Sequence, residues 1–101
     1  MLKELDPLLH SQLRLAIVSI LMSVDEADFV YLREKTNATA GNLSVQIDKL
    51  TNAGYIEANR VLDGKKTRTR CKMTDVGRKA FEKYVKALKS YLVINKKQNS
   101  I

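Results

Sequence analysis

The chain is poor in the residues that build covalent or metal-stabilised folds. Its 101 residues include one cysteine, one histidine, one proline and no tryptophan. A lone thiol cannot form an intrachain disulfide, and one cysteine with one histidine cannot complete a structural zinc site. We therefore expect no metal and no cofactor. Such sparse cysteine usage is typical of a reducing cytoplasm, where we expect the protein to reside.

Long apolar runs are also missing. The densest run, residues 13–24, is interrupted by Arg14 and Ser19 and is too short to cross a bilayer. The preceding segment lacks the basic start of a secretory signal, and no small-residue cleavage site follows Val24. We expect no membrane partner.

The parts of an enzyme site are lacking as well. The four glycines lie far apart, so no glycine-rich phosphate loop can form. His10 precedes a predicted helix, and Cys71 falls on the inward face of a predicted strand, as a small core residue would. The acidic residues between 25 and 28 lack the spacing of a calcium loop. The sequence therefore predicts no catalytic residue.

What the chain does have is positive charge, unevenly placed. Eighteen basic and eleven acidic side chains give a net charge of +7. Residues 1–58 hold five basic and eight acidic side chains, whereas residues 59–101 hold thirteen basic and three acidic. Concentrated positive charge suits a polyanion, because each neutralised phosphate releases condensed counterions. A lysine-rich surface that only maintains solubility is the alternative at this point.

Helical periodicity and capping residues organise most of the chain. Ser11, the acidic stretch 25–28, Thr39 and Thr74 are placed as N-caps, and Gly54 is placed as a helix stop. The pattern predicts helices over about 12–24, 29–36, 40–53 and 75–92. The turn at 37–38 is short enough to make the second and third of these a helix-turn-helix.

A β-hairpin is predicted between the third and fourth helices. Asp63-Gly64 separates two β-capable segments, 55–62 and 65–73, and such a pair is a strong hairpin signal. The fold class is therefore mainly α with a small β-hairpin wing, in the order helix, helix, helix, hairpin, helix. We expect one winged helix-turn-helix domain over residues 1–92, with a dimerisation helix at about 75–92 and a polar tail at 93–101.

The third helix is the candidate DNA-binding element, because a helix fits the major groove and short polar side chains at its start reach base edges. Asn42 and Gln46 suit adenine, and Val45 suits a thymine methyl group. Such residues are equally common on a solvated helix face, so this helix alone does not decide the function. The candidate residues are Thr39, Asn42, Ser44, Val45, Gln46 and Lys49.

The hairpin strengthens the DNA-binding interpretation. Between residues 60 and 72, six cations, including Lys72, stand against one acid, Asp63, and such crowding is costly without a counter-charge. Two or three would suffice to protect an edge strand from aggregation, which is the alternative role. The candidate wing contacts are Arg60, Lys65, Lys66, Arg68 and Arg70.

Several segments between residues 7 and 92 resemble the MarR-like winged-helix regulators. Residues 32–36, 42–50 and 53–56 are similar to the second and third helices of that family, and residues 67–78 to its second wing strand and the following "x-L-T-x-x-G" helix start. Residues 9–17 are similar to the first helix of its short, stand-alone members. Met73 stands where the family usually has leucine. The resemblance implies sequence-specific binding of duplex DNA, typically as a repressor, with Asn42, Val45 and Gln46 in the groove. It leaves open whether a small-molecule effector binds at the dimer interface.

The first and last helices carry more apolar surface than one small core needs, which indicates an interface between two copies of the chain. A larger monomeric core is the alternative. The expected interface residues are Leu15, Val18, Met22, Tyr84, Leu88 and Tyr91. Two other functions stay open: a winged helix that docks another protein, and a general or RNA-directed nucleic-acid-binding protein.

Overall fold

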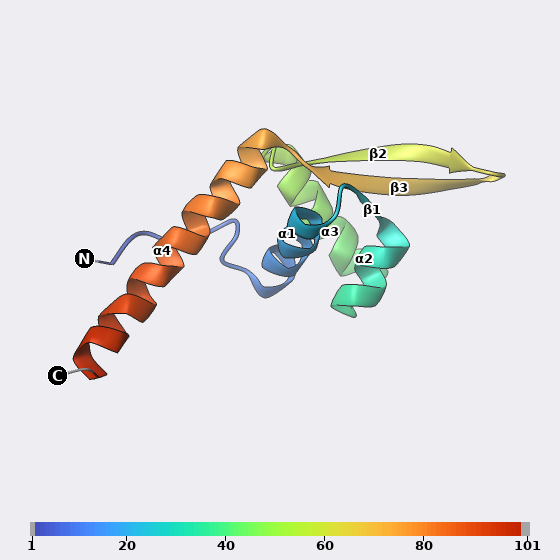
Figure 1. Cartoon of the computed structure of the whole chain (residues 1–101). Coiled ribbons are helices and arrows are strands. Elements are labelled where there is room, and N and C mark those ends of the chain that lie inside the picture. The colour runs from blue at the N-terminus through green and yellow to red at the C-terminus, as the bar shows by residue number, and fades with distance from the viewer. Residues whose placement is uncertain (1, 100–101) are drawn as a thin grey trace.

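The computed structural model describes residues 2–99 and has the predicted winged-helix architecture (Figure 1). Its helices are α1 (Gln12–Ser23), α2 (Phe29–Thr36), α3 (Ala40–Asn52) and α4 (Asp75–Asn99). Its strands are β1 (Ala27–Asp28), β2 (Ile56–Asp63) and β3 (Lys66–Met73). Within residues 2–99 no helix combines the length and apolar character needed to cross a membrane.

The helix boundaries follow the capping residues. The Asp28 carboxylate accepts a hydrogen bond from the Tyr31 N–H, and the Thr39 hydroxyl accepts one from the Asn42 N–H. Ser11 occupies the N-cap of α1, but its side chain makes no capping hydrogen bond. Gly54 has the left-handed backbone expected of a helix stop, with φ of 79°.

The core lies where the three short helices meet the sheet. The predicted inward stripe of α3 is confirmed, because Leu43, Ile47 and Leu50 are all buried. Cys71 and Met73 face this core from β3, as their predicted shared strand face requires. The other buried contributors include Leu9, Ile17, Val18, Leu21, Leu32 and Ile56.

The sheet differs from the prediction in two ways. Its strand order is β1-β3-β2, all antiparallel, and β1 was not predicted because two residues are too short to show a period. Asp63 pairs with Lys66, so the two turn residues are Gly64 and Lys65 rather than Asp63 and Gly64. Gly64, with φ of 66°, supplies the positive φ that such a turn needs at its first central position.

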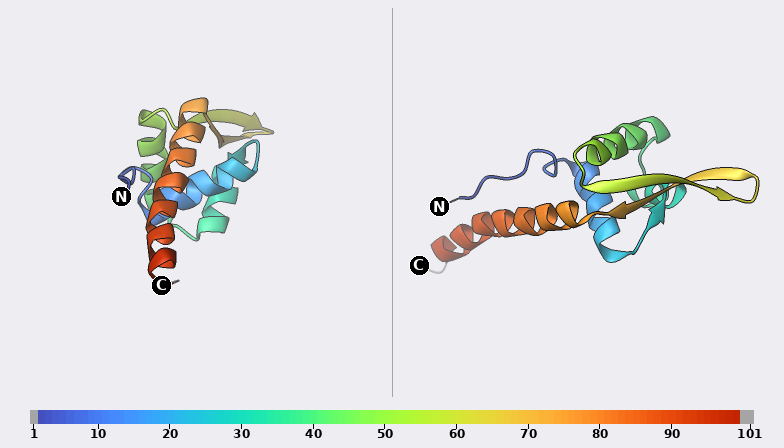
Figure 2. Two further views of the ribbon diagram at one scale, coloured as in Figure 1. Left: turned by 60° about the vertical axis from the view of Figure 1, so that its left-hand side comes forward. Right: turned by 90° about the horizontal axis from the view of Figure 1, so that it is seen from above.

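The molecule is elongated, with principal extents of 63 × 25 × 21 Å. Its radius of gyration is 15.9 Å, whereas a compact chain of this length has about 13 Å. The hairpin and α4 project toward opposite ends (Figures 1 and 2). Helix α4 reaches Asn99, beyond the predicted end near Leu92, so the helix takes in most of the predicted polar tail.

The N-terminal segment, residues 2–11, runs along α4. The Lys3 N–H donates to Ser90 Oγ at 3.2 Å, and the Tyr91 hydroxyl donates to the Lys3 carbonyl at 3.1 Å. His10 Nδ1 lies 2.9 Å from the Tyr84 hydroxyl. This segment therefore covers one side of the projecting helix.

Two residues expected at a dimer interface belong instead to the core of the single chain. Val18 is fully buried and Tyr84 is 4% exposed, because α1 packs into the core with a wider stripe than expected and the N-terminal segment covers Tyr84. These two assignments are corrected. Of the other four, Leu88 is 38% exposed, and Leu15, Met22 and Tyr91 are half-buried.

Candidate nucleic-acid interface

The solvent-facing side of α3 carries the residues predicted to contact DNA. Thr39 holds the start of the helix by its hydrogen bond to the Asn42 N–H, at 3.2 Å. Val45 is 49% exposed. The exposed members of the predicted set are Thr39, Asn42, Ser44, Val45 and Lys49, whereas Gln46 is half-buried.

Gln46 is half-buried because it contacts a residue that was not among the predicted site residues. Arg14, on α1, donates from Nη1 to Gln46 Oε1 at 2.5 Å and from Nε to the Leu8 carbonyl at 2.6 Å. Gln46 Nε2 in turn donates to Asn42 Oδ1 at 3.0 Å. The only sequence signal for Arg14 was a charge interrupting the apolar stretch of α1. Its partner lies 32 positions away, which local periodicity cannot reveal.

The hairpin follows α3 directly and carries two kinds of cation. Arg60, Lys65 and Lys66 are exposed and have no ion-pair partner among the residues that the structure describes. Their charge is free to meet phosphates. Lys65 and Lys66 lie at the end of the hairpin, where Asp63 and Lys66 form the last pair before the turn, and Arg60 lies midway along β2, opposite Thr69.

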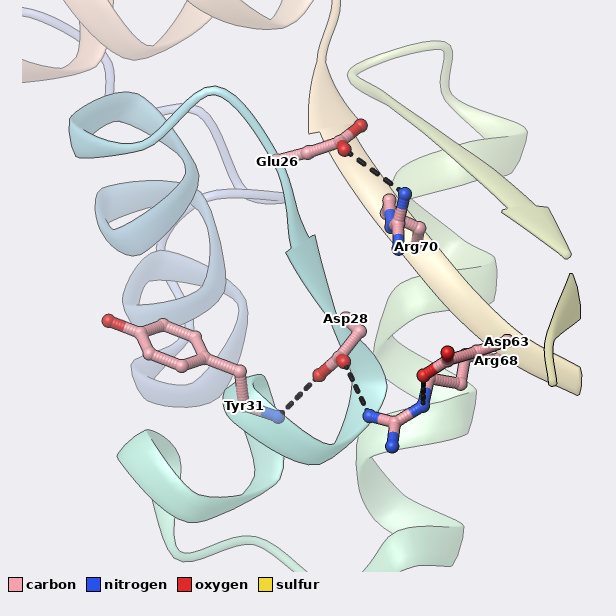
Figure 3. Close-up of polar contacts among 6 residues, drawn as sticks. All are labelled: Glu26, Asp28, Tyr31, Asp63, Arg68 and Arg70. Carbon is pink, nitrogen blue, oxygen red and sulfur yellow. Dashed lines mark hydrogen bonds and ion pairs between the residues drawn. The ribbon is translucent and has the colours of Figure 1, made fainter. Parts of the chain in front are cut away.

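The other wing cations are already paired (Figure 3). Arg68 Nη1 lies 3.0 Å from Asp28 Oδ2, and Arg68 Nε lies 2.9 Å from Asp63 Oδ2. Arg70 Nη1 lies 3.3 Å from Glu26 Oε1. Lys72, the sixth cation of the hairpin, pairs with Glu57 at 3.5 Å. The predicted wing set therefore divides into three free cations and two that carboxylates partly neutralise.

Asp28 joins the wing to the helix-turn-helix. Its Oδ1 accepts the Tyr31 N–H at the start of α2, while its Oδ2 faces Arg68 (Figure 3). The hydrogen bond from Tyr31, followed by the pair with Arg68, holds the pKa of this carboxyl below its usual range against the opposing effect of burial. Asp28 is therefore ionised at neutral pH.

Cys71 and His10 have side chains that can take part in catalysis, but each lies where it contributes to packing or hydrogen bonding within the chain. Cys71 is fully buried, and this burial raises the pKa of its thiol to about 11. A thiol with such a pKa is a poor nucleophile at neutral pH. His10 lies within hydrogen-bonding distance of the Tyr84 hydroxyl, where the N-terminal segment meets α4.

A three-helix core followed by a basic two-stranded wing defines the winged helix-turn-helix class. The family model described as "Winged helix DNA-binding domain" matches residues 13–92. The chain therefore belongs to the winged helix DNA-binding domain family, as its sequence resemblance predicted. This family of DNA-binding domains includes transcriptional regulators.

Two proteins are similar to this chain over most of their length. An uncharacterized protein of Methanocaldococcus jannaschii is 34% identical over 76 residues, which cover 75% of this chain and 83% of that protein. The structure of a transcriptional regulator homologue from Pyrococcus horikoshii superimposes with a TM-score of 0.78 at 26% identity, covering 84% of each chain.

Two more distant structures share the fold. Bacillus subtilis PadR, solved in complex with operator DNA, has a TM-score of 0.67 at 19% identity, covering 74% of this chain and 47% of PadR. A MarR-family regulator from Silicibacter pomeroyi has a TM-score of 0.64 at 18% identity, covering 90% of this chain and 71% of that one. At these identities the likeness concerns the fold.

Proposed function

We propose that this protein is a sequence-specific regulator of transcription that binds duplex DNA as a homodimer and represses by occupying its operator. The observation that carries this proposal is the exposed polar face of α3 followed directly by a hairpin with three free cations. A helix in the major groove supplies base contacts, and cations beside it supply phosphate contacts. The protein has no catalytic role in this proposal and acts in the cytoplasm.

Each candidate residue has a role in this arrangement. Asn42, Val45 and Gln46 face base edges in the major groove. The short hydroxyls of Thr39 and Ser44, together with Lys49, meet the phosphates that flank it. On the wing, Arg60, Lys65 and Lys66 contribute full charges to the phosphate backbone, and Arg68 and Arg70 contribute less because carboxylates already face them.

In vitro selection of duplexes from a random pool tests the proposal. We expect the parent protein to enrich one motif with two-fold symmetry, because a symmetric dimer presents two identical recognition helices. Enrichment without a motif would indicate a general nucleic-acid-binding protein. No retention of duplex at low salt would indicate that the winged helix docks another protein instead.

The free wing cations should govern the salt dependence of binding. Replacing Arg60, Lys65 and Lys66 together by alanine should weaken binding to all duplexes alike. It should also lower the slope of log K against log salt by about 0.9 for each phosphate that the variant no longer neutralises. Fluorescence anisotropy between low and moderate salt measures that slope. Replacing Arg78, Lys79 and Lys89 together by alanine, at exposed sites on α4, removes the same charge and is the matched control, which should leave the slope unchanged. A triple variant with the parent slope would remove the wing from the interface.

Neutralising the carboxylate beside Arg68 should strengthen binding. Asparagine remains a good N-cap, so Asp28→Asn keeps the cap of α2 while freeing one arm of the Arg68 guanidinium. We expect tighter binding to random duplex and a salt slope steeper by up to about 0.9. Anisotropy titrations of variant and parent in parallel measure both quantities. Weaker binding would mean that the ion pair holds the wing in place rather than competing with phosphate.

The homodimer and its effector are placed at α4 in this proposal. The exposed apolar residues Leu88 and Leu92 lie on one side of α4, and the N-terminal segment lies on another. Between that segment and α4 is a cavity of about 700 Å³, a size that suits a small molecule. We place a small-molecule effector there. The cavity is lined by cationic, acidic and aromatic residues that include Lys3, Asp6, Tyr55, Lys83 and Lys86.

A further inference from the structure

The hydrogen bonds from Arg14 to Gln46 and on to Asn42 run in one direction only. A guanidinium group has N–H donors and no acceptor, so the Gln46 atom that faces Arg14 must be the amide oxygen. The Gln46 amide nitrogen therefore points the other way, toward Asn42 Oδ1, to which it donates at 3.0 Å. One arginine on α1 thus fixes the amide orientation of two residues on the recognition helix.

The result is a surface that offers donors. The oxygen of Asn42 is engaged by Gln46, which leaves Asn42 Nδ2 as the group that faces solvent. Within the part of the chain that the structure describes, no group accepts a hydrogen bond from that nitrogen. Asn42 is exposed at the N-terminal half of α3, where side chains reach base edges.

Donors and acceptors distinguish the purines in the major groove. Two-point contact between an amide and adenine needs the amide oxygen to accept from N6 while the amide nitrogen donates to N7. Guanine presents two acceptors, N7 and O6, and requires donors alone. The Asn42 oxygen keeps a second lone pair, but adenine N6 would have to share this oxygen with the Gln46 N–H, whereas Asn42 Nδ2 is shared with no other group. This arrangement favours guanine over adenine, contrary to the residue-type expectation from the sequence.

We infer that Arg14 is a positioning residue that sets the base preference of the recognition helix, and that the base opposite Asn42 is guanine. This inference rests on the proposed sequence-specific binding of duplex DNA. Arg14 need not contact DNA, because it acts through Gln46. Its bond to the Leu8 carbonyl, at 2.6 Å, holds the guanidinium in the orientation that the chain of hydrogen bonds needs.

Selection from a random duplex pool, followed by anisotropy on single-base variants of the selected site, tests the inference. Asn42→Ala locates the position that Asn42 contacts, because preference there is abolished. At that position the parent should favour guanine over adenine by about fivefold, near the lower end of the discrimination that a good base contact gives. Arg14→Met should reduce this ratio to about twofold or reverse it, since both amides are then free to rotate.

Three further variants complete the experiment. Arg14→Lys keeps a donor-only group beside Gln46 and should retain guanine. Arg78→Met removes an exposed arginine from α4 and should change neither base preference nor motif. If circular dichroism shows that Arg14→Met is unfolded, Gln46→Met breaks the same chain at its centre and should give the same loss of guanine preference.

The outcomes distinguish a failure of the proposed sequence-specific function from a failure of the role of Arg14. A parent protein that enriches no motif would overturn the proposed sequence-specific function. A parent motif with adenine at the Asn42 position, or a guanine preference that survives both Arg14→Met and Gln46→Met, would overturn the role of Arg14 and leave the proposed function standing.

Discussion

Replacing Gly77 by alanine is expected to lower the midpoint of thermal unfolding by more than about 10 °C, which corresponds to a loss of about 3 kcal/mol in a domain of this size. Gly77 is the third residue of α4 and is buried. A Cβ at this position would lie 1.9 Å from the Tyr55 carbonyl oxygen and 2.7 Å from its carbon. Relieving a contact this close requires the Tyr55 backbone to move away from α4, and the elements joined to it must move as well.

The clash falls on the junction that joins three elements. The Tyr55 carbonyl, between α3 and β2, accepts a hydrogen bond from the Thr74 N–H at 3.1 Å. The Thr74 hydroxyl donates to the Gly54 carbonyl at 2.6 Å and also lies 3.0 Å from the Tyr55 carbonyl oxygen. The Thr74 hydroxyl also caps α4 by accepting the Gly77 N–H at 3.0 Å. A methyl group here would separate α4 from the start of the wing, break these bonds and open the core beside Met73.

Differential scanning calorimetry of Gly77→Ala against Gly41→Ala measures the effect. Gly41 is the second residue of α3, and a Cβ there would meet no atom within 4 Å. Alanine at that position should be neutral or stabilise by up to about 1 kcal/mol, because glycine disfavours helix. Equal midpoints for the two variants would show that α4 can shift to accommodate the methyl group.

Gly77 also shows which features of the fold could be predicted from the sequence alone and which could not. The motif from Thr74 to Gly77 placed the start of the last helix correctly, and the caps at Asp28 and Thr39 placed two others. Caps and helical stripes are predictable because they depend on residues three or four positions apart. The reason for a glycine at 77 is the Tyr55 carbonyl, 22 positions away, and only the fold brings the two together.

For the candidate site, too, local features could be predicted from the sequence and contacts between distant residues could not. The exposed residues of α3 were found because a helix with one buried stripe exposes the rest. The pairs of Arg68 with Asp28 and of Arg14 with Gln46 span 40 and 32 positions, so no local pattern could reveal them. Their consequence is chemical, since they decide which wing cations are free and how the α3 amides are oriented.

The exposed stripe of α4 is the strongest argument for a dimer. Phe81, Val85, Leu88 and Leu92 recur at intervals of four, three and four, beside the buried stripe that contains Tyr84 and Ala87. The first two of these are half-buried, and Phe81 packs against the core. Leu88 is 38% exposed and Leu92 is 61% exposed. Such spacing is typical of a helix that packs against another helix. Each square ångström of apolar surface covered by a second copy would contribute roughly 25 cal/mol.

Leu88→Glu is expected to convert the proposed dimer into a monomer. A carboxylate placed in a dry helix–helix contact has no partner, and its burial costs more than the contact gains. Multi-angle light scattering at micromolar concentration should give twice the chain mass for the parent and the chain mass for the variant. Lys89→Gln changes the net charge by the same amount at the neighbouring exposed position and should remain dimeric.

The same variant should separate dimerisation from DNA contact. A two-fold dimer sets its recognition helices about 34 Å apart, one turn of duplex, so both half-sites contribute to binding a palindrome. Leu88→Glu should therefore weaken binding to a palindromic site by more than about tenfold, which is 1.4 kcal/mol, while binding to a half-site changes little. Circular dichroism should match the parent, since Leu88 lies outside the buried core. A parent protein that scatters as a monomer and binds both sites alike would refute the dimer.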